Sequence, residues 1–272
     1  MKRTFRREHQ LLLAVASVCL NFGAVWADEP DMGPSESDNS GLAILSNATN
    51  VTHWGLGVGA GLEQMPYKGY GTKFSPVPLI SFDDKWVHVF GDTVDLKIGR
   101  WNGVSVTLRG EYAFDSGYKQ SDAPILNGMQ KRNSAFWYGP AIAWRSSFGT
   151  ISGSFLAGGN KGQKAEIDFS RSFDYGNFSF EPHVGAEWLS NKFVDYYYGV
   201  RPSEVRAGRP AYTGKSTYDV SAGVRMDYHI THHQMVLLNL GVSHLGSGIT
   251  NSPLVGKKTI PEAMFGYLYQ FN

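Results

Sequence analysis

Cysteine is nearly absent, since the 272-residue chain contains only Cys19. Charged residues are also scarce: they make up 18% of the chain, below the roughly 25% of typical soluble domains. The chain has no apolar run near the roughly 18 residues that a membrane-spanning helix needs. The net charge of +1 gives no reason to expect a nucleic-acid partner. These shortages argue against a disulfide-stabilised protein, a helical membrane protein and a nucleic-acid-binding protein.

Residues 1–27 have the organisation of a secretory signal peptide. A basic start is followed by an apolar run at 11–20 and by Val25-Trp26-Ala27, which has the small-x-small character of a signal-peptidase site. We therefore predict cleavage between Ala27 and Asp28. Cleavage removes Cys19 and leaves a mature protein without disulfides or thiol chemistry.

Residues 28–52 have a different composition from the rest of the chain. Five acidic residues fall within this segment, and it contains no Lys or Arg. Such a polar segment of one charge sign has too little apolar surface to form a core. We predict an acidic, flexible periplasmic tail at 28–52, followed by a single barrel domain at 53–272.

From Trp54 onward, apolar side chains recur at every second position, which is the period of a β-strand with two different faces. Several alternating runs reach the roughly 9–11 residues that a tilted strand needs to cross a bilayer. Only a closed barrel pairs every backbone group in lipid. The sequence therefore predicts an all-β, antiparallel, up-and-down transmembrane barrel. The twelve expected strands are 53–62, 72–82, 85–91, 93–99, 103–114, 134–146, 149–158, 163–173, 178–189, 217–230, 234–243 and 262–271.

The strands at 85–91 and 93–99 have the weakest patterns, and without them the barrel would have ten strands. The connection lengths favour an even number, because the long segments 115–133, 190–216 and 244–261 all fall at one end. Outer-membrane barrels have short periplasmic turns and long outer loops. The long segments are therefore expected to lie outside the cell.

Full charges fall on the strand face that is expected to point into the barrel. They could form an ion-pair network that fills a narrow lumen, which their mixed signs favour, or they could line a small polar pore. The charges are Arg109, Glu111, Glu166, Asp168, Glu181, Glu187, Arg225 and Asp227.

The outer loops are rich in basic residues, and Arg suits the phosphates of lipopolysaccharide. An ordinary solvated loop surface would explain the same residues equally well. The residues expected to contact lipopolysaccharide are Lys131, Arg132, Arg201, Arg206 and Arg209.

No pattern in the sequence predicts catalysis or a cofactor. Residues 55–60 resemble a phosphate-binding loop, but their glycines alternate along one strand, as small residues on a crowded inner face would. His232 and His233 are adjacent, and no carboxylate or cysteine lies at ligand spacing, so we expect no metal. His183 and His244 are the most plausible bases, and nothing places a nucleophile beside either. We expect no enzyme activity.

The loop sequence Asp195-Tyr196-Tyr197-Tyr198-Gly199-Val200 resembles a segment of the MipA/OmpV family of outer-membrane proteins. The stretches Trp54-Gly55-Leu56-Gly57 and Phe136-Trp137-Tyr138-Gly139-Pro140 resemble the same family, so the likeness covers the whole barrel. The tyrosines could form an interfacial girdle or pack inside a folded loop.

The resemblance implies an integral outer-membrane barrel surrounded by lipid and lipopolysaccharide. It also implies a non-enzymatic scaffold that links a lytic transglycosylase and a bifunctional penicillin-binding protein in peptidoglycan synthesis. A small diffusion pore for polar solutes or antibiotics is the alternative expectation, and a surface adhesin is the third.

Overall fold

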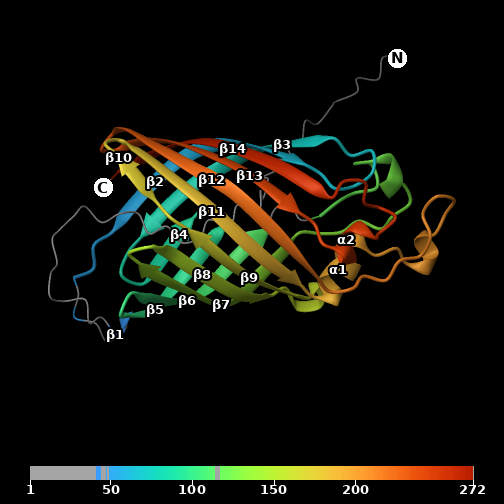
Figure 1. Cartoon of the computed structure of the whole chain (residues 1–272), viewed down its shortest axis with the longest axis horizontal. Helices are drawn as coiled ribbons and strands as arrows, with labels where there is room; N and C mark the ends of the chain where they lie inside the picture. The colour runs from blue at the N-terminus through green and yellow to red at the C-terminus, as the bar shows by residue number, and fades with distance from the viewer. Residues whose placement is uncertain (1–40, 44–46, 48, 114–116, 272) are drawn as a thin grey trace, which may run out of the picture.

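The computed structural model describes residues 41–43, 47, 49–113 and 117–271. The predicted signal peptide, with its cleavage site at Ala27 and Asp28, lies outside the described residues, as does most of the tail at 28–52. The described chain forms one antiparallel sheet that curves round into a barrel (Figure 1). The predicted fold class is therefore confirmed.

Twelve strands form a closed ring, because β14 pairs with β2 and β5 pairs with β6. The predicted count of twelve is confirmed, and the alternative of ten is wrong. The ring strands are β2 (His53–Gln64), β3 (Thr72–Asp83), β4 (Val87–Phe90), β5 (Thr93–Trp101), β6 (Val104–Ala113), β7 (Ala135–Ser146), β8 (Gly149–Ala157), β9 (Gln163–Ser170), β11 (Phe178–Leu189), β12 (Thr217–Thr231), β13 (Gln234–His244) and β14 (Thr259–Gln270).

Two short strands add to this ring. β1 (Gly41–Leu42) pairs with β5, and β10 (Phe173–Tyr175) pairs with β11. The expected strand at 163–173 is thus interrupted after Ser170, and its continuation is β10. The final strand begins at Thr259, three residues before its predicted start at 262.

Side chains alternate across the barrel wall as the sequence predicted. Val58 and Tyr218 are about 70% exposed on the outer face (69% and 70%), whereas Leu79 and Leu237 on the inner face are fully buried. The apolar outer face suits contact with hydrocarbon, and the barrel leaves no open sheet edge between β14 and β2. No helix among the described residues is long and apolar enough to span a bilayer.

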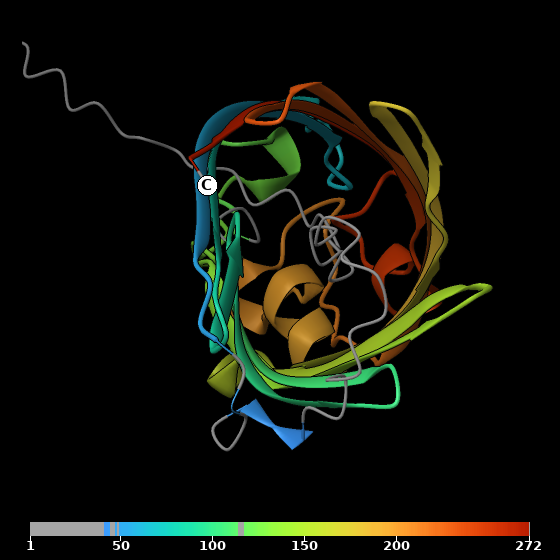
Figure 2. The same ribbon diagram turned by 90° about the vertical axis from the view of Figure 1, so that its left-hand side faces the viewer.

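Helices lie in the connections at one end of the barrel. The long connections contain α1 (Asn191–Tyr198), α2 (Ser247–Thr250) and the 3-10 turns η2 (Pro124–Leu126) and η4 (Pro202–Glu204), and the short β8–β9 connection contains the 3-10 turn η3 (Gly159–Lys161). In the view along the barrel, α1 lies inside the ring of strands (Figure 2). The opposite end has short turns, such as Asn102-Gly103, where both residues adopt positive φ values of 48° and 78°. This asymmetry places the turn end in the periplasm and the loop end outside.

Candidate functional site: a loop plug above a charged lumen

Four connections at the loop end pack into one apolar cluster. We call residues 65–71, 117–134, 190–216 and 245–258 the loop plug. Each of the four connections contributes buried side chains to the cluster, so the four loops form one packed unit. The buried members are Met65, Tyr67, Tyr118, Ala123, Leu126, Met129, Val200 and Leu254.

Helix α1 anchors the loop plug to the inner wall of the barrel. Ser190 caps the helix, because its hydroxyl accepts a hydrogen bond from the backbone N–H of Phe193 at 3.3 Å. Phe193 and Tyr197 lie against the inward-facing Trp137, whose ring centroid is 5.4 Å from that of Phe193. The helix therefore lies in the barrel mouth and packs against its inner wall (Figure 2).

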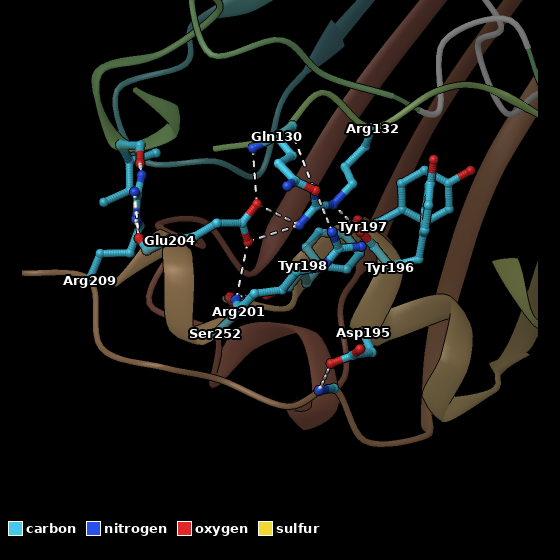
Figure 3. Close-up of polar contacts among 12 residues, drawn as sticks. Gln130, Arg132, Asp195, Tyr196, Tyr197, Tyr198, Arg201, Glu204, Arg209 and Ser252 are labelled. Carbon is cyan, nitrogen blue, oxygen red and sulfur yellow. Dashed lines mark hydrogen bonds and ion pairs between the residues drawn. The ribbon is translucent and has the colours of Figure 1, made fainter. Parts of the chain in front are cut away.

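The three tyrosines of α1 each bind a different part of the loop plug (Figure 3). The Tyr196 hydroxyl accepts from the backbone N–H of Asn133 at 3.0 Å. The Tyr197 carbonyl accepts from the hydroxyl of Tyr67 at 3.4 Å, and the Tyr198 carbonyl accepts from Ser252 at 2.6 Å. The tyrosine run thus packs inside a folded loop and forms no interfacial girdle.

Asp195 and Gly199 close the end of the same helix. The Asp195 side chain accepts from the backbone N–H of Gly214 at 2.9 Å, and its carbonyl accepts from the N–H of Gly199 at 3.0 Å. A Cβ on Gly199 would collide with the Asp195 carbonyl, and a Cβ on Gly214 would collide with the Asp195 backbone. Both positions therefore require glycine. The next residue, Val200, pairs with Tyr212 through two backbone hydrogen bonds.

A buried ion pair joins two of the four connections. The Arg132 guanidinium lies 3.0 Å from the Glu204 carboxylate, and each side chain is only 2% exposed. Arg132 also donates to the carbonyl of Tyr196 at 2.7 Å. The Glu204 carboxylate accepts from the backbone N–H groups of Gln130 and Arg201 at 2.9 and 3.1 Å. Both charges have the several partners that a buried pair needs (Figure 3).

Arg209 is buried in the same cluster. Its guanidinium donates to the backbone carbonyls of Glu204, Ile125 and Asn127. Arg132 and Arg209 therefore hold the loops together, and the structure corrects the expectation that they contact lipopolysaccharide. The physical reason is burial, because each is 2% exposed and its donors are directed into the protein.

The other basic residues of that set are exposed at the loop end. Arg201 and Arg206 each donate to another connection of the loop plug, to the side chain of Gln130 and to the carbonyl of Pro124. For Lys131, Arg201 and Arg206, contact with lipopolysaccharide stays a prediction.

Burial and hydrogen bonding act in opposite directions on the carboxyl group of Glu204. Burial favours the neutral form, but the two backbone donors and the Arg132 guanidinium outweigh it and hold the pKa of Glu204 below its ordinary value. At the nearby Tyr118, burial is the largest effect and outweighs the neighbouring arginines, so the pKa of its hydroxyl rises to about 12. The ion pair is thus charged at every pH above the acid range.

We expect the loop plug to stay intact down to moderately acid pH. The pKa of Glu204 is lower in the folded plug than in a detached loop. The pair therefore stabilises the plug fully above the ordinary value of about 4.3 and loses this contribution as the pH falls through the lowered value. Hydrogen exchange at residues 201–206, corrected for intrinsic rates, should show constant protection from pH 7 to about 5 and a loss only below about 4. A loss of protection between pH 6 and 5 that is absent from Glu204→Gln would contradict this assignment, because Glu204 would then titrate above its ordinary value.

Ion pairs cross the lumen below the loop plug. Arg109 makes a bidentate pair with Asp95, with both N–O distances at 2.8 Å, and Asp95 is almost fully buried. Lys164 lies 2.8 Å from Glu111 and 4.0 Å from Glu187. These contacts join β5 to β6 and β6 to β9 and β11 on the inner face. Asp95 and Lys164 were not among the predicted network residues, although the alternation of apolar and polar side chains along their strands makes both positions inward-facing.

The remaining predicted lumen charges lie on the same inner face. Arg225 pairs with Asp227 on β12 at 2.9 Å. Glu166 lies directly opposite Glu187 in the β9–β11 register. Asp168 is buried, and Glu181 lines a cavity together with Arg225 and Asp227. Whether these charges fill the lumen or select solutes stays a prediction.

A cavity of about 640 Å³ occupies the turn end of the lumen. Its lining includes the two ion pairs Arg109–Asp95 and Arg225–Asp227 and residues of the short turns, such as Ser147 and Gly176. The barrel interior is therefore hollow near the periplasmic turns, with charged, polar and some apolar side chains lining the cavity.

The histidines form no metal-binding group within the described residues. No group of three His, Cys, Asp or Glu side chains there could hold a metal ion. His244 contacts the hydroxyl of Thr259 at 3.2 Å, and His233 contacts the carbonyl of Gln270 at 3.1 Å. The absence of enzyme activity stays a prediction.

Comparison with known proteins identifies the family. The family model described as MltA-interacting protein MipA matches residues 56–271. The putative outer membrane protein YiaT of Escherichia coli K12 is 24% identical over 237 residues, which cover 85% of this chain and 95% of YiaT. The MltA-interacting protein of Escherichia coli K12 is 25% identical over 239 residues, which cover 84% of this chain and 96% of that protein.

Among solved structures, an outer membrane channel from Pseudomonas putida F1 aligns with a TM-score of 0.41 and 10% identity, over 88% of this chain and 99% of the channel. The family model spans nearly the whole barrel, and the curated relatives are named as outer-membrane or MltA-interacting proteins. The chain is therefore an integral outer-membrane β-barrel that belongs to the MipA family.

Proposed function

We propose that this protein is a non-conducting outer-membrane scaffold that binds a peptidoglycan-remodelling enzyme through its periplasmic end. The observation that carries the proposal is the loop plug. Four connections, a buried ion pair and α1 fill the outer mouth of the barrel. A barrel packed in this way is poorly suited to solute diffusion, whereas its periplasmic turns remain accessible.

The family relationship supports a partner of one class. A relative that aligns over 96% of its own length is named for an interaction with MltA. We expect the same class of partner here, a lytic transglycosylase, with a bifunctional penicillin-binding protein as the second enzyme on the scaffold. The contact surface would be the turn end, which faces the periplasm, together with the acidic tail predicted at 28–52.

A diffusion pore is the second candidate, and the cavity of about 640 Å³ at the turn end is the observation that favours it. A pore would need this cavity to continue past α1 to the outer surface. Conductance measurements separate the two functions.

Cross-linking from the periplasmic side tests the scaffold. Because the predicted mature chain contains no cysteine, a single Ser147→Cys variant places one reactive group in the exposed β7–β8 turn. The matched control is Ser203→Cys, an exposed serine of the loop plug at the opposite end. We expect a thiol-directed photo-cross-linker to capture a lytic transglycosylase or a penicillin-binding protein in intact cells from position 147 and not from position 203.

A form that lacks residues 28–52 then locates the contact. Loss of the cross-link with the tail would assign the contact to the tail, and its persistence would assign it to the turns. Recovery of assembly factors and lipopolysaccharide alone from position 147 would contradict the scaffold.

A further inference from the structure

Among the described residues, the outer part of β3 lacks a neighbouring strand on one side. β3 pairs with β2 over its whole length, from Thr72 to Asp83, but with β4 only at Ser81, Phe82 and Asp83. β4 has four residues, and the chain then turns back into β5. Within the described part of the chain, the outer part of β3, Thr72–Leu79, therefore has a strand neighbour on one side only.

The direction of the backbone groups on β3 follows from one hydrogen bond. The N–H of Gly91, just after β4, donates to the carbonyl of Ile80 at 3.0 Å, so the backbone of Ile80 is directed toward β4. Because directions alternate along a strand, the backbone groups of Phe74, Pro76 and Pro78 are directed to this same side. These three residues line the edge that has no neighbouring strand.

Two of the edge positions are prolines, which have no N–H to leave unpaired. An unsatisfied backbone donor in hydrocarbon costs several kcal/mol, so proline at Pro76 and Pro78 removes two such costs. Proline also prevents a further strand from adding to the edge, since it cannot donate to a β-ladder. The edge suits contact with hydrocarbon and does not suit pairing with a second copy of the chain or a partner strand.

The inner face beside this edge is polar at Lys73 and Ser75 and apolar at Val77 and Leu79. Val77 and Leu79 of β3 pack with Phe90 of β4 and with Met264 and Leu268 of β14. The lumen of an outer-membrane barrel is ordinarily polar, and β5, β6 and β9 here carry inward-facing ion pairs. On β3, apolar side chains lie on both faces: Phe74, which is 66% exposed, on the lipid-facing side, and Val77 and Leu79 on the inner side.

We propose that the edge of β3 between Thr72 and Leu79 borders a lateral seam in the barrel wall that admits an acyl chain of an outer-leaflet lipid. The seam is continuous with the lipid-facing belt of the barrel. The acyl chain lies against Pro76 and Pro78 and reaches Val77, Leu79 and Phe90. This site is independent of the proposed scaffold role at the turn end.

Photolabelling of the complete mature protein in lipid vesicles tests the seam. The vesicles contain a phosphatidylethanolamine with a diazirine near the end of one acyl chain, and the adducts are mapped by mass spectrometry. Leu79 and Leu156 form a matched pair, because both are inward-facing leucines with 1% exposure, on β3 beside the seam and on β8 in the closed wall. We expect labelling at Val77 and Leu79 to exceed that at Leu156 by at least about tenfold, since inner side chains of a closed wall do not meet lipid.

Val184 provides the positive control, because it is 54% exposed on the lipid-facing side of β11. Labelling of Val184 with no excess at Val77 and Leu79 over Leu156 would overturn the proposal. A dimer cross-linked through residues 72–80 would also overturn it, because a second copy would then occupy the edge.

Discussion

Replacing Arg132 by methionine should destabilise the loop plug by about 3–5 kcal/mol, because removal of one partner leaves the other charge buried and unpaired. The charge left behind is Glu204, which is 2% exposed. Its two backbone hydrogen bonds remain and should hold the effect near the lower end of this range. We expect faster tryptic cleavage after the exposed Arg206, and a larger conductance in planar bilayers than that of the unmodified protein.

Two further variants separate the buried pair from general effects of charge. Lys119→Met removes an exposed positive charge from the same connection and should leave proteolysis unchanged. Arg132→Met combined with Glu204→Gln removes both charges and should recover part of the lost protection. Equal protection in Arg132→Met and Lys119→Met would show that the ion pair does not hold the loops.

Gly57→Ala should impair closure of the barrel. Gly57 lies on β2 opposite Leu268 of β14, and a Cβ there would collide with the carbonyl of Tyr267. The β2–β14 ladder joins the first and last strands of the ring, so the clash acts where the barrel closes. Overpacking of this kind costs about 3 kcal/mol. We expect a lower urea midpoint for unfolding, measured as loss of the heat-modifiable band in gel electrophoresis.

The matched control is a strand glycine with more space around it. A Cβ on Gly153 of β8 would lie 3.2 Å from its nearest neighbour, the carbonyl of Glu166, which can yield slightly. Gly153→Ala should lower the midpoint by much less than Gly57→Ala. Similar midpoints for the two variants would indicate that the β2–β14 junction is not unusually close.

The ring of strands could be predicted from the sequence because each strand carries its own signal. The alternation of apolar and polar side chains follows from the local period of two in a β-strand. It is pronounced in an outer-membrane barrel, because the outer face contacts lipid and the inner face is polar. Even the weakly patterned strands β4 and β5 are present, although β4 has only four residues and pairs with β3 at three positions. The break after Ser170 was missed because the alternation continues across it into β10.

The loop plug could not be predicted, since its structure depends on contacts between distant parts of the chain. Arg132 and Glu204 are 72 residues apart, and no periodic pattern relates them. In the sequence, Arg132 and Arg209 cannot be distinguished from the exposed arginines of a basic loop. They are buried only because four connections pack together. The segment at 191–198 has a helix cap at Ser190, but its aromatic run allowed either a girdle or a packed loop.

The most direct test of a closed outer end is the conductance of the complete mature protein in planar bilayers, measured beside Arg132→Met under the same salt and voltage. The loop plug predicts a silent or barely conducting barrel for the unmodified protein and a clear increase for the variant. A steady ohmic conductance of the same size in both proteins would contradict the closed mouth and would favour the diffusion pore.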